Sequence, residues 1–228
     1  SPLKGTIKTS GSKNATLPIF FSSILADGPL KLLNTPQLSD VSTTLRLLMD
    51  MGSNFVLEED GSISLDSSKL TNLKADYALV KTMRASILTL GPMLAKYKKA
   101  KISLPGGCAI GTRPVNLHLD ALEKMGATIE VKNGYIYATA KELIGAQINF
   151  DLISVTATEN IIMAASLAKG ITTINNAAQE PEVTDLIRCL IKMGAKITGE
   201  NTSTLIIEGV EYLDGVEYSI CPDRIEAG

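Results

Sequence analysis

Three polar segments of the sequence contain residue types that bind anions or transfer protons. In residues 10–15 (SGSKNA), a glycine and Lys13 stand just before an apolar run that predicts a helix. Backbone N–H groups at the start of a helix have no partner within the helix, and together with a lysine they attract an anion. The segment is not a Walker loop, because the second glycine and the Lys-Ser/Thr pair are missing. A simple helix-entry loop is the alternative interpretation.

The second segment, residues 81–86 (KTMRAS), places two cations, Lys81 and Arg84, in the first turn of another expected helix. Cations in that position oppose the helix macrodipole, which is a small local cost. Residues that break a local rule are candidates for function. A solvated basic turn is the competing interpretation.

The third segment, residues 105–118, is the strongest candidate. It has three glycines in six residues and an Arg113-Pro114 step that predicts the start of a helix. Cys108 lies among these glycines, and an exposed thiol near a cation stays reactive. Such a thiol donates a proton or attacks a carbon. A buried, inert cysteine is the alternative.

Other titratable residues predict less chemistry. The single histidine, His118, has no evident triad partner, so we expect an orienting or structural role. Glu180 and Glu182 flank a proline where a helix should begin, and helix capping competes there with ligand contact. Cys189 falls within a helical pattern and Cys221 within an expected strand, so both are predicted to be structural.

These segments are positioned by a chain that repeats itself three times. A Met-Gly pair and a Leu-Ala pair each recur with a period of about 70 residues. The pairs stand at 51–52, 125–126 and 193–194, and at 25–26, 94–95 and 167–168. Two independent markers with the same period indicate three equivalent structural units.

Each unit predicts the same elements in the same order. Apolar residues at positions −7, −4 and −1 before each Met-Gly glycine form a helical stripe, and the glycine ends that helix. Asp60-Gly61 and Asn133-Gly134 predict hairpin turns, and residues 200–203 form a weaker third turn. Upstream apolar helices and the strands after them are expected at 15–26 and 30–33, at 85–95 and 101–104, and at 159–168 and 172–175.

The predicted fold class is therefore α/β, a pseudo-threefold repeat of β-α-β-α-β-β units with helices inside and sheets outside. One domain is expected over 13–221, with repeats at about 5–75, 76–145 and 146–215. Residues 217–221 predict a last strand. Segments 1–12 and 222–228 are expected to cross to a second domain that is absent from this chain.

Composition limits the classes of function. The 228 residues are 45% hydrophobic and 20% charged with a net charge of −2, which excludes a disordered chain and argues against broad nucleic-acid binding. No stretch reaches the roughly 18 apolar residues of a membrane span. Three widely spaced cysteines and one histidine do not predict a metal site, and no cofactor is expected. We expect a cytoplasmic protein.

The segments 10–19, 81–86, 106–118, 157–160 and 222–228 together resemble the UDP-N-acetylglucosamine enolpyruvyl transferases (1-carboxyvinyltransferases, MurA type). Members of that family are about twice this length and have two similar domains around a cleft, and this chain resembles the N-terminal half. The resemblance implies transfer of the enolpyruvyl group of phosphoenolpyruvate to the 3-hydroxyl of UDP-N-acetylglucosamine, with release of phosphate. This reaction is the first committed step of peptidoglycan synthesis.

The resemblance also implies roles for individual residues. Lys13 and Arg113 would bind phosphoenolpyruvate, Arg84 would support phosphate binding, and Asn14 would contact the sugar nucleotide. Cys108 would protonate the enol carbon or form a covalent adduct, and it is where fosfomycin would attack. The residues expected to line the nucleotide site are Pro114, Leu117, Ser154, Val155 and Thr156.

The family's general base and further arginines lie in the half absent from this chain, so we expect the chain alone to be inactive. Two alternatives stay open. One is the sister enzyme that acts on shikimate 3-phosphate, disfavoured because its first loop has Asp-Lys-Ser and it lacks the loop cysteine. The other is a noncatalytic ligand-binding domain of the same fold.

Overall fold

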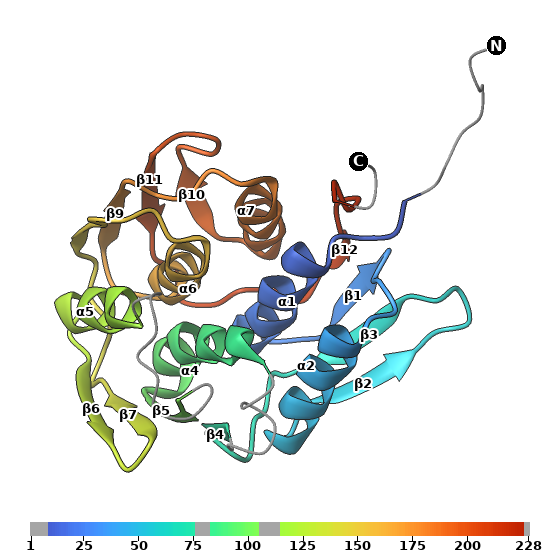
Figure 1. Ribbon diagram of the computed structural model, residues 1–228, viewed down its shortest axis with the longest axis horizontal. Helices are drawn as coiled ribbons and strands as arrows, with labels where there is room; N and C mark the ends of the chain where they lie inside the picture. The colour runs from blue at the N-terminus through green and yellow to red at the C-terminus, as the bar shows by residue number, and fades with distance from the viewer. Residues whose placement is uncertain (1–8, 76–82, 105–114, 226–228) are drawn as a thin grey trace.

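Three small sheets surround a group of helices in the computed structural model, which describes residues 9–75, 83–104 and 115–225 (Figure 1). Each sheet has four strands. The first contains β1 (Leu30–Leu33), β2 (Asn54–Leu57), β3 (Ile63–Asp66) and β12 (Glu217–Ser219). The second contains β4 (Lys74–Ala75), β5 (Lys99–Ser103), β6 (Thr128–Lys132) and β7 (Tyr135–Thr139). The third contains β8 (Gln147–Asn149), β9 (Ile171–Asn175), β10 (Lys196–Thr198) and β11 (Thr204–Glu208).

The three sheets share one topology, which confirms the predicted repeat. Their strand orders are β12-β1-β3-β2, β4-β5-β7-β6 and β8-β9-β11-β10. In each sheet the first pair is parallel and the next two pairs are antiparallel. A parallel pair needs a crossover, and the first helix of each unit supplies it in the second and third sheets.

In the first sheet, the place of β4 and β8 is taken by β12, from the other end of the described chain. Lys31 of β1 pairs with Glu217, so the last strand of the described chain completes the sheet that contains its first strand. The strand ends at Ser219 rather than at the predicted Cys221, which lies just beyond it. Gly11 forms an isolated bridge with Pro222, and this holds the two ends side by side.

The first helix of each unit lies near the centre of the molecule (Figure 1). These are α1 (Lys13–Ser22) continued by the 3₁₀ turn η1 (Ser23–Leu25), the 3₁₀ segment η2 (Arg84–Thr89) continued by α4 (Leu90–Tyr97), and α6 (Val155–Ser166). The second helices of the units are α2 (Ser39–Asp50), α5 (Asn116–Lys124) and α7 (Pro181–Met193).

The predicted helix over 85–95 is thus two segments. Pro92 explains the division, because a proline has no N–H to donate to the carbonyl four residues earlier, and a continuous α-helix from residue 84 would need that bond. In addition, Thr89 donates its hydroxyl to the carbonyl of Ser86, which favours the tighter 3₁₀ turn.

The predicted stripes and helix ends are confirmed. All nine stripe residues are buried: Leu45, Leu48, Met51, Leu119, Leu122, Met125, Ile187, Leu190 and Met193. The glycines that follow have positive φ angles of 107°, 96° and 112° at Gly52, Gly126 and Gly194, the conformation that glycine adopts without strain.

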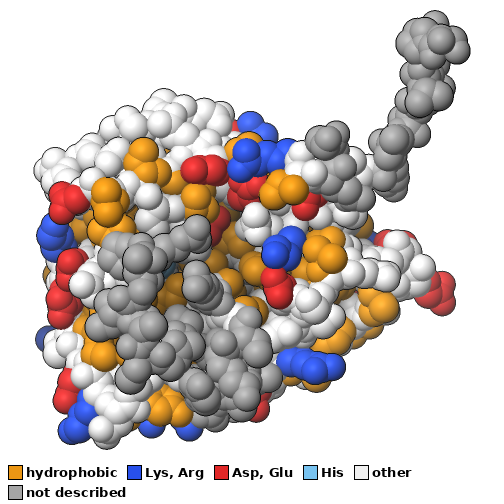
Figure 2. Space-filling model, in the orientation of Figure 1, with side chains coloured by type: hydrophobic (Ala, Val, Ile, Leu, Met, Phe, Trp, Pro, Cys, Tyr) orange, Lys and Arg blue, Asp and Glu red, His pale blue; other side chains and the backbone are white. Residues whose placement is uncertain are grey.

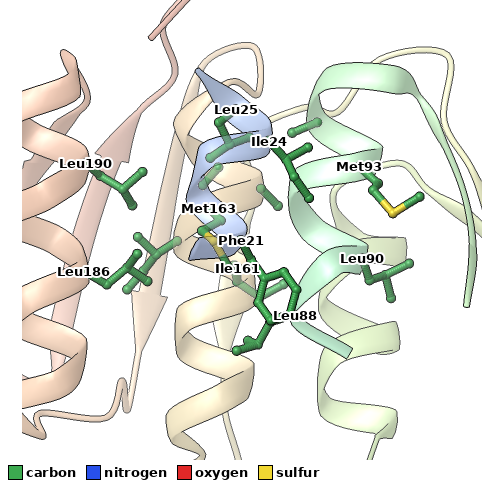
Figure 3. Close-up of a cluster of buried hydrophobic side chains, with 14 of the residues drawn as sticks. Phe21, Ile24, Leu25, Leu88, Leu90, Met93, Ile161, Met163, Leu186 and Leu190 are labelled. Carbon is green, nitrogen blue, oxygen red and sulfur yellow. The ribbon is translucent and has the colours of Figure 1, made fainter. Parts of the chain in front are cut away.

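One continuous core joins the three units. Phe21 of α1, Leu88 of η2 and Ile161 and Met163 of α6 meet at its centre, and each is at most 1% exposed (Figure 3). Leu186 and Leu190 of α7 approach the same cluster from another side (Figure 3). Because the inner helices are apolar on most of their surface, they are stable only when packed together in this way.

Candidate functional site

The first turns of three inner segments line one pocket of about 280 Å³. Asn14 is the second residue of α1, Ala85 the second of η2, and Val155 the first of α6. Segments from all three units therefore converge at this pocket. The remaining lining residues are Leu17, Pro18, Leu88, Thr156, Glu159, Glu180, Glu182 and Arg224.

Basic, acidic and hydrophobic side chains lie close together on this face of the molecule (Figure 2), over the region where α1, α6 and α7 approach one another in Figure 1. The first turns of α1 and α6 contain no acidic residue. Their positive ends therefore have no acidic partner within their own first turns, although Glu159, Glu180 and Glu182 line the same pocket.

Lys13 lies beside this pocket, in a second depression of about 320 Å³ that shares Asn14 with the first. Its Nζ is 3.0 Å from Oδ2 of Asp40 in α2, and both side chains are about two-fifths exposed. Asp223 and Ile225 of the C-terminal segment line this depression as well. The first candidate loop therefore does present a cation at the start of a helix, as the sequence predicts.

Ser12 and Ser154 position the two helix ends. Ser12 is the N-cap of α1 and accepts a hydrogen bond from the Ala15 N–H at 3.3 Å, and its own N–H donates to the Cys221 carbonyl. Ser154 caps α6 by accepting from the Ala157 N–H at 3.2 Å. Ser154 is therefore one residue outside the pocket lining, whereas Val155 and Thr156 belong to it.

A buried network behind Thr156 connects α6 with its neighbours. The side-chain amide of Asn160 donates to the Ile87 carbonyl at 3.0 Å and to Nδ1 of His118 at 2.9 Å, and its oxygen accepts from the Gly91 N–H at 2.7 Å. Because Nδ1 accepts, Nε2 carries the proton and faces the Thr156 hydroxyl at 3.4 Å. Burial lowers the pKa of His118 to about 4, so the imidazole is neutral and orients its neighbours, as expected.

Glu159 was not predicted as a site residue, although it lies within one of the motifs. It is only 2% exposed, and its Oε1 has no hydrogen-bond partner among the described residues. Burial, followed by the nearby charges of Glu182 and Glu180, raises its pKa well above the usual value. The one sequence signal for it is an acidic residue that opens a buried apolar helix, since glutamate is seldom buried without a partner.

Arg224 closes one side of the pocket. Its Nε is 3.0 Å from Oε1 of Glu182 and its Nη2 is 3.3 Å from Oε2, a two-pronged contact. The Glu182 side chain is 5% exposed and that of Arg224 is 58% exposed. Glu182 therefore lies in the first turn of α7, as predicted. It also forms an ion pair with Arg224 of the C-terminal segment.

Several predicted site residues cannot be placed. Cys108, Arg113 and Pro114 lie outside the described residues, and of Arg84 only the backbone position at the start of η2 is described. Leu117 is half-buried on α5, next to His118, and does not line either pocket. The other two cysteines are structural in position: Cys189 is buried in α7, and Cys221 donates its backbone N–H to Asp185.

The described part of the chain contains no helix long and apolar enough to cross a membrane. Within the same residues, no group of three or more His, Cys, Asp and Glu side chains is placed to hold a metal ion. The pocket itself is formed by helix ends, hydrogen-bonding side chains and apolar side chains.

Comparison with known protein families identifies the family of this chain. The family described as EPSP synthase (3-phosphoshikimate 1-carboxyvinyltransferase) matches residues 1–228, the full length of the chain. The chain belongs to the EPSP synthase family. Within this family, the resemblance to the UDP-N-acetylglucosamine enolpyruvyl transferases is confirmed by curated relatives of high identity.

This EPSP synthase-family chain is similar to proteins named UDP-N-acetylglucosamine 1-carboxyvinyltransferase. The protein of Ruthia magnifica subsp. Calyptogena magnifica is 75% identical over 226 residues, which are 99% of this chain and 54% of that protein. That of Hydrogenovibrio crunogenus is 57% identical over the same shares of the two chains. The chain thus spans about half the length of the curated relatives it matches.

Two solved structures confirm the fold class. The enolpyruvyl transferase NikO from Streptomyces tendae superposes with a TM-score of 0.84 at 22% identity, over 99% of this chain and 53% of that one. EPSP synthase from Acinetobacter baumannii gives 0.77 at 18% identity, over 98% and 51%. At such identities the likeness concerns the fold alone.

Proposed function

We propose that this chain is the N-terminal half of a UDP-N-acetylglucosamine 1-carboxyvinyltransferase. The whole protein transfers the enolpyruvyl group of phosphoenolpyruvate to the sugar 3-hydroxyl and releases phosphate, in the cytoplasm, as a step of peptidoglycan synthesis. One observation carries the proposal: relatives with that name are 56–75% identical over 99–100% of the chain.

The pocket chemistry is compatible with these substrates. Phosphoenolpyruvate and a nucleoside diphosphate sugar are anionic, and the chain as a whole has a net charge of −2. Such ligands need a few fixed cations and helix ends to hold them. Lys13 at the start of α1 and the first turns of α1 and α6, which contain no acidic residue of their own, provide these features.

The proposed residue roles follow the motifs. Lys13 and Arg113 bind phosphoenolpyruvate, Arg84 supports phosphate binding, and Cys108 transfers a proton to C3 of phosphoenolpyruvate or forms a covalent adduct at C2. Asn14 contacts the sugar nucleotide. The nucleotide part is held by residues at the starts of α5 and α6 and in the segment before α5: Pro114, Leu117, Ser154, Val155 and Thr156.

The mechanism that these roles support is an addition followed by an elimination. The sugar hydroxyl attacks C2 of phosphoenolpyruvate while C3 accepts a proton, and the tetrahedral product then loses a proton from C3 together with phosphate. Cations beside the phosphate stabilise the negative charge that the leaving group carries. The base that deprotonates the sugar hydroxyl is assigned to the other half of the protein.

Phosphate release by the full-length protein tests the proposal. We expect release from phosphoenolpyruvate that depends on UDP-N-acetylglucosamine, and none with shikimate 3-phosphate. Lys13→Gln should lower kcat/KM for phosphoenolpyruvate roughly 10- to 100-fold, because a charge-assisted contact to an anion is lost. Lys196→Gln is the matched control, since this exposed lysine of β10 pairs with Glu208 and lies on the third sheet.

Release with shikimate 3-phosphate in place of the sugar nucleotide would overturn the proposed substrate. An equal loss of activity in both lysine variants would contradict the role of Lys13. Substrate-dependent release by the 228-residue chain alone would contradict its assignment as half of the active protein.

A further inference from the structure

Asp40 approaches the Lys13 side chain from the first turn of the second helix. Lys13 is the first residue of α1 and Asp40 the second residue of α2, and Nζ of Lys13 donates to Oδ2 of Asp40 at 3.0 Å. The two residues are 27 positions apart in the chain, so their contact depends on the packing of α1 against α2, which lie side by side (Figure 1). The proposed mechanism uses Lys13 and gives Asp40 no role.

The backbone of Asp40 is held firmly by the rest of α2. Thr44, which is fully buried, donates its hydroxyl to the Asp40 carbonyl at 2.8 Å. The next residue, Val41, is 4% exposed and belongs to the core. Lys13, in contrast, has a flexible four-carbon side chain. In this ion pair the short aspartate side chain is therefore the fixed partner, and the lysine is the partner that is held.

The ion pair contributes little to the stability of the fold. The two side chains are 38% and 42% exposed, and ion pairs exposed to this degree stabilise proteins only weakly. The pair lies in the depression of about 320 Å³ described above, beside the C-terminal segment. What the contact does determine is the direction in which the Lys13 ammonium group points within this depression.

A fixed ammonium group is better prepared to bind an anion than a free one. Lysine has three N–H donors around Nζ, and the bond to Asp40 uses one of them, which restricts where the other two point. A free lysine loses rotamer freedom when it binds a ligand, and this loss lowers affinity. Because Asp40 has already restricted Lys13, less of that loss remains for the binding step.

The negative charge of Asp40 opposes this effect only in part. Asp40 is the acidic residue in the first turn of α2, where the helix end carries roughly half a positive elementary charge. The helix end therefore stabilises the carboxylate and weakens its repulsion of an anion bound to Lys13. Repulsion and restriction act on affinity in opposite directions, and only the restriction requires the Lys13 ammonium group.

We propose that Asp40 is a positioning residue, whose carboxylate directs the Lys13 ammonium group toward the phosphate of phosphoenolpyruvate. The inference rests on the proposed function and deepens it, because it assigns the residue that prepares this cation for its substrate. Asp40 acts through Lys13 and does not itself touch phosphoenolpyruvate.

A double-mutant cycle in the full-length protein isolates this role. Asp40→Ala frees the ammonium group, Lys13→Gln removes it, and a third variant carries both substitutions. Steady-state phosphate release gives kcat and the KM for each substrate separately. Asp40→Glu is the conservative variant. Asp50→Ala, at the exposed last residue of the same helix, is the matched control.

We expect Asp40→Ala to raise the KM for phosphoenolpyruvate about 5- to 10-fold, the size of one net hydrogen bond, and to leave the KM for UDP-N-acetylglucosamine unchanged. In the Lys13→Gln background the same substitution should no longer raise the KM for phosphoenolpyruvate, because only the repulsion is removed there. Asp40→Glu should recover part of the loss, and Asp50→Ala should behave as the wild type.

An equal increase of this KM in both backgrounds would overturn the proposal, because Asp40 would then act independently of Lys13. An unchanged or lower KM in Asp40→Ala alone would overturn it as well, since the ion pair would then not assist binding. A merely structural role would lower the melting temperature and change the KM of both substrates. If release by Lys13→Gln is too slow to measure, dissociation constants for phosphoenolpyruvate in the same four proteins complete the cycle.

The proposed function is tested separately, by release from the wild type that depends on UDP-N-acetylglucosamine. Where that release is present and the cycle shows no coupling between Asp40 and Lys13, this inference fails and the proposed function stands. Where the wild type shows no such release, the proposed function fails, and this inference fails with it.

Discussion

The side-chain amide of Asn160 joins α6 to three neighbouring segments. It bonds to η2 through Ile87, to α4 through Gly91 and to α5 through His118. A Cβ atom at Gly91 would collide with Asn160, so a glycine is required where α4 passes α6. A single amide thereby sets the spacing of elements from the second and third units, on which the pocket depends.

His118 gives this network a pH dependence with a definite sign. Its pKa is about 4 in the folded chain and about 6.5 in an unfolded one, so the unfolded state binds more protons between these values. The neutral imidazole therefore contributes stability above pH 6.5 that is lost as pH falls through 4. We expect the free energy of unfolding of the wild type to decrease by about 3 kcal/mol more than that of His118→Gln between pH 7 and pH 4.

Urea unfolding of both proteins at a series of pH values measures this difference. The acidic residues, including Glu159, are the same in the two proteins, so their contributions to the pH dependence of stability cancel in the comparison. Parallel pH profiles would show that His118 keeps an ordinary pKa in the folded chain. A wild type that gains stability relative to His118→Gln at low pH would show that the imidazolium is favoured.

Helices and hairpins could be predicted from the sequence because their signals are local. The stripe that ends in Met193 and Gly194 needs only the 3.6-residue period and the conformational freedom of glycine. The pairing of β12 with β1 joins residues 31 and 217, and no local pattern specifies such a partner. Helical periodicity likewise places Glu159 on a helix, but what it faces is decided by α7 and the C-terminal segment.

Strand β12 is held in the first sheet by a buried carboxylate on α7. Tyr218 donates its hydroxyl to Oδ1 of Asp185 at 2.6 Å, and the backbone N–H of Cys221 donates to Oδ2 at 3.0 Å. Asp185 is 5% exposed, so it depends on these two donors. The closing strand is thus attached to the third unit as well as to the first.

We therefore expect Tyr218→Phe to lower the free energy of unfolding by about 1.5–3 kcal/mol, the range for a lost hydrogen bond to a charged group. Tyr212→Phe is the matched control, because Tyr212 is 61% exposed, and its effect should be within about 0.5 kcal/mol. Hydrogen exchange should accelerate most at the amides of Lys31 and Ile220, which donate to Val216 and Leu33 across the closing strand. Equal effects of the two substitutions would show that Asp185 does not hold β12.

The three units share one core, and this decides how the chain unfolds. In a linear solenoid each repeat contacts only its neighbours, and local unfolding is possible. Here the inner helices of all three units meet around Phe21, Leu88 and Ile161, while β12 closes the ring from the far end of the chain (Figures 1 and 3). Loss of packing at the centre removes support from each sheet at once.

We expect the 228-residue chain to unfold in a single transition, and Phe21→Ala to lower its stability by about 3–5 kcal/mol without dividing that transition. Amide hydrogen exchange of β1, β5 and β9 follows the three sheets separately. All three signals should shift together in urea. Val131→Ala, at a 53% exposed position on β6, is the control and should change stability by about 0.5 kcal/mol or less. Separate midpoints for the three sheets would mean that each unit has its own core, and the pocket between the units would then be only as stable as the weakest of them.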